Sequence, residues 1–102
     1  MFVNVGRFRF RPMGQDERQS MMQRMEQDVP PIARESHGFR GVYFASVTDD
    51  ELMTVWLWDS QADWDAALAR FGPLLQEYVV PNLAGPPDRV DGEVVFQSHP
   101  EA

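Results

Sequence analysis

The chain of 102 residues contains neither cysteine nor lysine, and each absence excludes a class of chemistry. Without cysteine there can be no disulfide, no thiolate nucleophile and no thiolate ligand for zinc. Without lysine there can be no Schiff base, which rules out covalently bound pyridoxal phosphate. The lack of cysteine also fits a cytoplasmic protein, and we expect that location.

Long apolar runs and an excess of positive charge are missing too. No apolar stretch approaches the roughly 18 residues that indicate a membrane-spanning helix. Residues Met1 to Val5 lack the basic flank and apolar block that open a signal peptide. The formal net charge is −7, and an acidic surface repels phosphate. We therefore expect neither nucleic acid nor a membrane as a partner.

The sequence has the length and the apolar content of one folded domain. Apolar residues make up 43% of the chain, which is enough to form a core. We expect a single domain over residues 1–102, in which residues 98–102 form a frayed tail.

In the first half, apolar residues alternate over residues 2–11 and predict a strand that carries Asn4 on one face and the arginines on the other. Residues 15–28 predict an amphipathic helix with a stripe of methionines. The Pro30-Pro31 pair predicts a kink or a division of this helix, and Gly38 is expected to end it.

The second half opens with two β-rich runs, residues 39–47 and 51–58, separated by three polar residues and therefore predicted as an antiparallel hairpin. Ser60 and Asp63 resemble a capping box that begins a second helix. Gly72-Pro73 is expected to break that helix, which then continues to about Val80. A loop and a last strand, residues 89–97, complete the chain.

The order strand, helix, strand, strand, helix, strand predicts the α+β class with a split βαβ, or ferredoxin-like, arrangement. Both helices should cover one face of an antiparallel sheet. Both strand faces carry apolar residues, so the second face also needs cover. The expected groups are Phe39 and Tyr43 with Leu52, Trp56 and Trp58, and Val42 and Phe44 with Met53, Val55 and Leu57. A homodimer with sheets packed face to face, as a dimeric α+β barrel, is the simplest solution.

The chain resembles the antibiotic-biosynthesis-monooxygenase-like group of dimeric α+β barrels from about Phe2 to Phe96. The residues that carry the resemblance are Gly38-Phe39-Arg40-Gly41 and Trp58-Asp59-Ser60, with Ala62 and Trp64. The group includes cofactor-free oxygenases that act on polycyclic or quinol-type aromatics, and haem-degrading enzymes. The resemblance thus implies a homodimer and, for some members, oxygenase activity.

The haem-degrading branch of the group is disfavoured by what the chain lacks. Its members use an asparagine in the first strand, which Asn4 matches, and a histidine on the second helix as the iron ligand. No histidine occurs between Gly38 and Ser98. We expect no cofactor and, without a histidine or carboxylate cluster, no metal site.

Asn4 and the aromatic residues are the candidates for a pocket between the sheet and the helices. A buried Asn4 amide needs partners, which either neighbouring backbone or a ligand could supply. Trp56, Trp64 and Phe71 could line the pocket or serve as core residues. The predicted catalytic residues are Asn4, Tyr78 and His37, and the predicted substrate-binding residues are Trp56, Trp64, Tyr43 and Phe71.

His37 and the strand arginines each allow two interpretations. His37 has a suitable ordinary pKa for proton transfer, about 6.5, but its turn position favours a solvated side chain. Arg7, Arg9 and Arg11 share one strand face. They either form interface ion pairs, with Asp91 and Glu93 as the expected partners, or anchor an anionic ligand.

Three functions fit these features. The resemblance favours a small-molecule oxygenase that oxidises an electron-rich aromatic or quinol, positioned by Asn4, Trp56, Trp64 and Tyr78. The alternative is a non-enzymatic homodimer that binds a small apolar ligand or acts as an interaction module. An isomerase or lyase would need a proton-transfer residue, for which His37 is the candidate.

Overall fold

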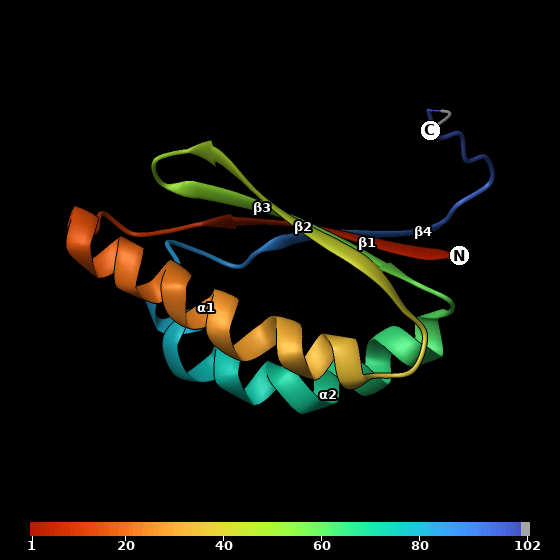
Figure 1. The fold of residues 1–102 in the computed structure, drawn as a ribbon. Helices are drawn as coiled ribbons and strands as arrows, with labels where there is room; N and C mark the ends of the chain where they lie inside the picture. Colours follow the sequence, from red (N-terminus) through yellow and green to blue (C-terminus); the bar gives the residue numbers. More distant parts are fainter. Residues whose placement is uncertain (101–102) are drawn as a thin grey trace.

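The protein was analysed as a computed structural model that describes residues 1–100. It has the predicted element order (Figure 1): β1 (Phe2–Arg9), α1 (Gln15–Glu35), β2 (Phe39–Thr48), β3 (Glu51–Trp58), α2 (Gln61–Tyr78), the short 3-10 helix η1 (Val80–Asn82) and β4 (Asp88–Glu93). Of the tail predicted at 98–102, residues 101 and 102 lie outside the described part.

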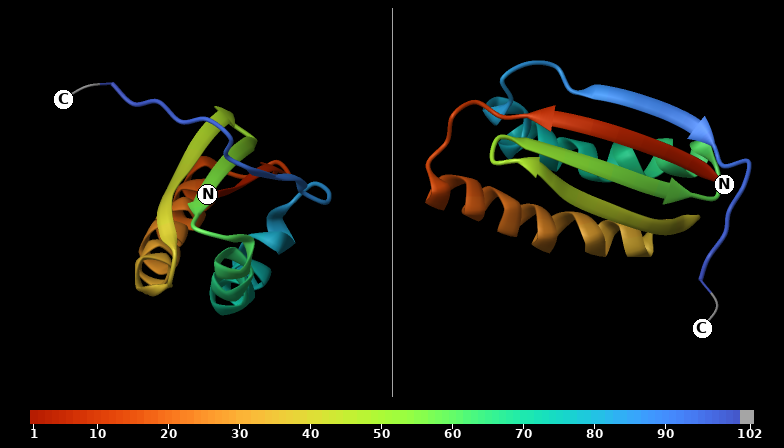
Figure 2. Two further views of the ribbon diagram at one scale, coloured as in Figure 1. Left: turned by 90° about the vertical axis from the view of Figure 1, so that its right-hand side faces the viewer. Right: turned by 90° about the horizontal axis from the view of Figure 1, so that it is seen from above.

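The four strands form one antiparallel sheet in the order β2-β3-β1-β4. Both helices lie side by side against one face, and the other face is open (Figures 1 and 2). The ferredoxin-like α+β fold predicted from the element order is confirmed. The two edge strands are β2 and β4. The first and last strands, β1 and β4, pair with each other as expected.

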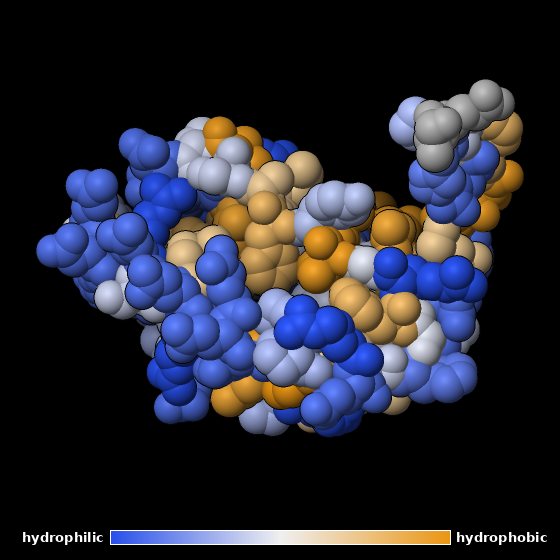
Figure 3. Space-filling view, viewed as in Figure 1, coloured by the Kyte–Doolittle hydropathy of each residue, from blue (hydrophilic) through white to orange (hydrophobic). Residues whose placement is uncertain are grey.

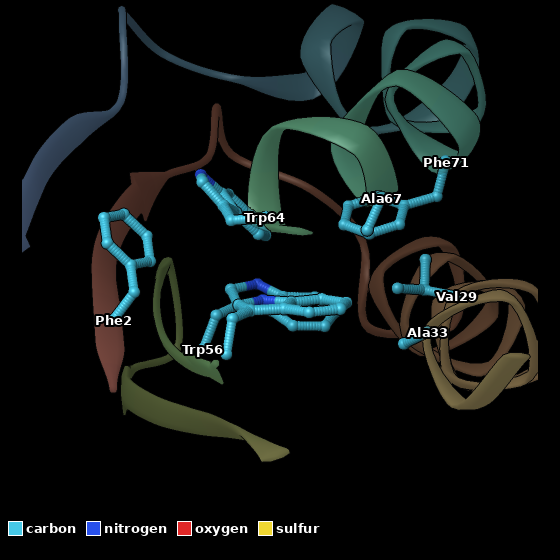
Figure 4. Close-up of a cluster of buried hydrophobic side chains, with 8 residues drawn as sticks. Phe2, Val29, Ala33, Trp56, Trp64, Ala67 and Phe71 are labelled. Atoms are coloured by element: carbon cyan, nitrogen blue, oxygen red, sulfur yellow. The ribbon is translucent and has the colours of Figure 1, made fainter. Parts of the chain in front are cut away.

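The core fills the space between the sheet and the helices and divides into two clusters. One is mainly aromatic, and it packs Phe2 of β1 and Trp56 and Trp58 of β3 against Trp64 and Phe71 of α2 and Val29 of α1 (Figure 4). The other contains the methionine stripe of α1, and includes Phe10, Met21, Met25, Leu52, Tyr78 and Val79. The methionine spacing thus correctly indicated a buried helix face.

Neither helix is divided at its prolines, so the predicted division at Pro30-Pro31 and the predicted break at Gly72-Pro73 were wrong. α1 runs through Pro30 and Pro31, and α2 runs through Gly72-Pro73. A proline within a helix removes the hydrogen bond to the carbonyl four residues earlier. Those carbonyls belong to Glu26, Gln27 and Ala69, all of which are exposed, so water can satisfy them.

The end of α1 also differs from the prediction. The helix ends at Glu35, and the Ser36 hydroxyl donates to the Ile32 carbonyl at 2.7 Å. Gly38 lies beyond the helix in the turn to β2, where its backbone has a left-handed φ of +80°. Its role is the sharp turn between two elements.

The predicted grouping of β2 with β3 was right for Phe39 but wrong for the rest of β2, because β2 contains a bulge at Arg40. Phe39 pairs with Trp58 and Gly41 with Leu57, which leaves one extra residue in β2. Beyond that point Val42 and Phe44 share the helix-facing side with Trp56. Tyr43 instead pairs with Val55 on the open face, where it is 67% exposed.

Arg7 and Arg9 of β1, and Arg11 just after it, pair within the chain, but not with Asp91 and Glu93. Arg7 Nη2 lies 2.7 Å from Glu51 Oε2, and Arg9 lies 3.5 Å from Glu51 and 3.6 Å from Asp88. Arg11 lies 2.6 Å from Glu17. Asp91 and Glu93 lie on the helix-facing side of β4, which the arginines Arg7 and Arg9 do not share.

Regular pairing ends earlier in β1 and in β4 than the sequence predicted. β1 ends at Arg9 rather than Arg11, and only the isolated bridge of Phe10 to Leu83 follows. β4 ends at Glu93 rather than Gln97. No helix within residues 1–100 is long and apolar enough to cross a membrane.

Candidate functional site

A small cavity lies between the sheet and the two helices, under the centre of β1 and β3. Its volume is about 30 Å³, and Asn4, Thr54 and Arg89 are its main polar lining residues. Apolar side chains from β1, β2, β3 and both helices form the rest of its wall. A cavity of this size can hold a water molecule, which needs roughly 10–15 Å³. It is therefore an interior site that must widen to admit a ring system.

Trp56 is the centre of the aromatic wall. Its ring centroid lies 5.1 Å from Phe71, 5.4 Å from Trp64 and 6.0 Å from Phe44. Figure 4 shows Trp56 projecting from the sheet towards Ala67 and Phe71 of α2. The predicted pocket residues Trp56, Trp64 and Phe71 all line the cavity. The arrangement offers flat aromatic faces to a flat apolar ligand.

A larger groove lies beside the cavity, between α2 and the β1–β4 edge of the sheet. Its volume is about 560 Å³, within the range of roughly 300–1,000 Å³ that is typical of ligand pockets. Groove and cavity share five lining residues, Phe8, Leu68, Leu75, Val79 and Arg89. These five side chains, which we call the neck, separate a ligand-sized groove from the aromatic interior.

Asn4 is held on one side by Asp91. The two residues are direct cross-strand partners in β1 and β4, and Asn4 Nδ2 donates to Asp91 Oδ1 at 2.5 Å. Asn4 is only 4% exposed, whereas Asp91 lies at the solvent-exposed sheet edge. We predicted that neighbouring backbone or a ligand would satisfy the Asn4 amide. Its nitrogen instead donates to the Asp91 carboxylate.

Thr54 and Arg89 are polar cavity residues that sequence reasoning missed. Both pair with Gly6 of β1, on either side of it, so all three lie in one row of the sheet. Thr54 is buried, and Arg89 makes no ion pair with any residue of the described chain. Strand register was the signal that could have found them, because Gly6 follows Asn4 on the same face.

Tyr78 is buried between the helices and does not line the cavity. Its phenol oxygen lacks a well-formed hydrogen bond, and the Arg24 guanidinium lies 4.0 Å from its ring centroid. Burial raises the pKa of the Tyr78 phenol, and the Asp28 carboxylate adds to the rise. The phenol therefore stays protonated at neutral pH. The Tyr78 side chain does not contact the cavity, and its catalytic role stays a prediction.

His37 and Tyr43 also lie away from the cavity. His37 is 88% exposed, and its Nδ1 lies 2.8 Å from Asp63 Oδ1 at the start of α2. The hydrogen bond to Asp63 raises the pKa of His37, and the same bond lowers the pKa of Asp63. Tyr43 is on the opposite face of the sheet because of the Arg40 bulge. Neither residue can reach a ligand in the cavity in this structure.

The acidic and histidine side chains do not gather into a metal-binding group. Within residues 1–100, no three or more of them are arranged to hold an ion. Ser60, Asp63 and His37 do form a local cluster, in which the Ser60 hydroxyl donates to Asp63 Oδ2 at 2.9 Å. The Asp63 amide donates to Ser60 Oγ at 3.2 Å, which confirms the predicted helix cap.

Comparison with known proteins places the fold among oxygenase structures. No protein-family model and no curated protein sequence matches the chain. The monooxygenase of ActVA-Orf6 from Streptomyces coelicolor, solved in complex with Nanaomycin D, has a TM-score of 0.75 at 22% identity, covering 98% of this chain and 92% of that one. SnoaB from Streptomyces nogalater, a cofactor-independent oxygenase, has a TM-score of 0.63 at 19% identity, covering 98% and 97%.

A third similar structure is described as a dimeric ferredoxin-like protein, from an uncultured marine organism. Its TM-score is 0.75 at 14% identity, with coverage of 98% of this chain and 92% of that one. At identities this low, the likeness establishes the fold and leaves the activity open. The chain has the ferredoxin-like α+β fold of the antibiotic biosynthesis monooxygenases, as its sequence resemblance predicted.

Proposed function

We propose that this chain is a small-molecule oxygenase that oxidises an electron-rich hydroxylated aromatic, such as a quinol, without a bound cofactor. The observation that carries the proposal is the aromatic cavity with Asn4, Thr54 and Arg89 in its wall, joined through the neck to a ligand-sized groove. A flat aromatic substrate would enter from the groove and displace the neck side chains. Its rings would then stack against Trp56 and Trp64.

The chemistry needs little from the protein beyond positioning and charge stabilisation. A deprotonated phenol or quinol is electron-rich enough to reduce O2. O2 is therefore the oxidant, and the substrate supplies the electrons. One oxygen atom would enter the product, and the other would leave as water. Arg89 is the positive group at the cavity and is placed to stabilise the phenolate or quinolate anion.

O2 uptake by purified protein tests the proposal, with 1,4-naphthohydroquinone and 1,8-dihydroxyanthrone as probe substrates. We expect uptake above the rate of uncatalysed autoxidation, and one atom of 18O from 18O2 in the anthrone-derived product. Arg89→Ala should lower the rate by about tenfold or more. Arg34→Ala, which removes an exposed arginine of α1, is the matched control and should leave it unchanged.

The alternative function is ligand binding without turnover. It is favoured by one observation, that the predicted catalytic residues His37, the proton-transfer candidate, and Tyr78 lie outside the cavity. Saturable binding of the same aromatics with O2 uptake no faster than autoxidation would support the binding function. It would also contradict the oxygenase. An isomerase or lyase that uses His37 gains no support, because His37 is remote from the cavity.

We also propose that the chain forms a homodimer through the open face of its sheet. Tyr43, Val55 and Val90 lie on that face, and Tyr43 and Val90 are the most exposed of its large apolar residues. After β4 the chain rises on the side of the sheet away from the helices (Figure 1). That segment carries Val95 and Phe96, which are 95% and 82% exposed. A second copy would cover both the face and the segment.

The surface of the helices is more hydrophilic than the open face of the sheet. In the view of Figure 3, hydrophilic side chains cover the helices, and hydrophobic ones gather between the helices and the sheet. The helical side therefore has the character of a solvated surface, while the exposed Tyr43, Val47 and Val90 lie on the sheet. This asymmetry favours the sheet as the interface of the homodimer.

A further inference from the structure

Asp91 fixes which atom of the Asn4 amide faces away from it. An ionised carboxylate can only accept hydrogen bonds, so the amide atom beside Asp91 must be the nitrogen. Asn4 Nδ2 donates to Asp91 Oδ1, and a hydrogen bond to an ionised acceptor is stronger than one between neutral groups. The Asn4 carbonyl oxygen therefore points away from Asp91, whatever partner it finds.

That carbonyl oxygen accepts no hydrogen bond from any residue in the described part of the chain, 1–100. Asn4 is nearly fully buried and lines the cavity. The atom is not among the fully buried side-chain atoms that lack a partner, Trp58 Nε1 and Tyr78 Oη, so a molecule in the cavity can reach it. A hydroxyl group brought in by a ligand would supply the missing donor.

We propose that Asp91 is a positioning residue, which orients Asn4 so that the site selects ligands with a hydroxyl donor over otherwise similar ligands without one. The inference rests on the proposed function only in taking the cavity as the ligand site. Arg89 lies two residues from Asp91 on the same strand face, a diagonal neighbour of Asn4 at about 7–8 Å. The site thus offers one acceptor and one cationic donor, which match a hydroxyl and a nearby oxyanion or carbonyl on one ring edge.

A purely structural role for Asp91 makes a different prediction. If Asp91 only joined β4 to β1, its replacement would weaken the binding of all ligands to the same extent. A positioning role instead predicts a loss of discrimination between ligands. Asparagine at position 91 can both donate and accept, so it would let the Asn4 amide turn either way. The ratio of two affinities therefore separates the two roles.

The test uses two probes of similar size, 1-naphthol and 1-methoxynaphthalene, with binding followed by quenching of tryptophan fluorescence. The wild-type protein should bind 1-naphthol more tightly by about fivefold, the effect of one net hydrogen bond. Asp91→Asn should reduce this ratio to between one and two. Asn4→Leu should do the same, and the double variant should change the ratio no further.

Asp88→Asn is the matched control, because Asp88 lies on the same strand but pairs with Arg9 on the open face. It should keep the wild-type ratio. A cooperative unfolding transition for each variant shows that it is folded. A wild-type ratio retained in Asp91→Asn would overturn the proposal, as would a wild-type ratio of one. Failure of both naphthalenes to bind would contradict both the ligand site and this inference, whereas discrimination without O2 uptake would contradict the oxygenase alone.

Discussion

The indole of Trp56 and the ring of Phe71 stack with their centroids 5.1 Å apart and their planes inclined by 15°. This contact joins the centre of β3 to the buried face of α2. Phe71 is 1% exposed and is among the largest fully buried side chains of the described chain. The same pair forms part of the cavity wall, so the core and the candidate site share these residues.

Phe71→Ala should destabilise the protein by about 3–5 kcal/mol, because it removes a fully buried ring and leaves a void beside Trp56. Phe71→Leu keeps most of the volume and should have a smaller effect, about 1–1.5 kcal/mol. Urea denaturation followed by tryptophan fluorescence measures both. Gln23→Ala, on the exposed side of α1, should stay within about 0.5 kcal/mol of wild type. Equal stability of Phe71→Ala and Gln23→Ala would contradict the packing described here.

Gly38→Ala should destabilise the turn between α1 and β2. A Cβ at this position would lie 2.2 Å from Asp63 Oδ2, and the φ of +80° is itself strained for alanine. We expect a loss of about 1–3 kcal/mol in the free energy of unfolding, measured by urea denaturation. Gly85→Ala is the control, since its Cβ would meet no atom within 4 Å. If both variants unfold at the same urea concentration, the close approach of Gly38 to Asp63 is wrong.

The pair of His37 and Asp63 should make stability depend on pH. The raised pKa of His37 means that its contribution is complete below its ordinary pKa of 6.5 and is lost as the pH rises through the raised value. The lowered pKa of Asp63 means that its contribution is present above 3.8 and is lost as the pH falls through the lowered value. Together they define a window between about pH 4 and 6.5.

His37→Gln should therefore lower Tm most within that window, and the difference from wild type should shrink as the pH rises through the raised pKa of His37. Thermal unfolding between pH 4 and 9 measures it, at low salt because the pair is exposed. Asp59 also raises the pKa of His37, and Glu35 and Arg70 line the same hollow, so Asp59→Asn serves as a comparison for the local charge. A difference in Tm that is constant across this range would show that the pair does not titrate as described.

The element order could be predicted from the sequence because strand alternation and helical spacing are local. The misplaced boundaries have a specific cause. Pro30, Pro31 and Pro73 were expected to interrupt helices, yet the carbonyls that they leave free belong to exposed residues, so water can satisfy them. Whether a carbonyl is solvated depends on which helix face is buried, and that is a property of the assembled fold. Sequence patterns alone do not contain it.

The candidate site was predictable only where strand parity was regular. Asn4 and Trp56 lie in uninterrupted strands, directly opposite each other, and both reach the cavity. Tyr43 follows the bulge at Arg40, which moves it to the open face. Arg89 became a site residue only through the pairing of β4 with β1, a long-range contact that local patterns do not specify.

Val55→Asp should prevent the proposed homodimer without unfolding the chain. Val55 lies at the middle of the open face, between Val5 of β1 and Tyr43 of β2, and its side chain does not enter the core between sheet and helices. A carboxylate there would be desolvated in a face-to-face dimer, with no arginine opposite it in the sheet. Native mass spectrometry and sedimentation velocity at micromolar concentration should show a wild-type dimer and a folded variant monomer.

Phe96→Asp tests whether the segment after β4 belongs to the same interface. Phe96 is largely exposed in the single chain. Adding Phe96→Asp to the monomeric Val55→Asp variant should therefore change its free energy of unfolding by no more than about 0.5 kcal/mol. In the otherwise wild-type chain it should weaken the dimer by about tenfold, if the ring is buried against the partner. Gln23→Asp, on the exposed face of α1, adds the same charge and should leave the dimer intact. A wild-type protein that sediments as a monomer would overturn the open-face homodimer, and a Phe96→Asp dimer of unchanged affinity would remove only the segment from it.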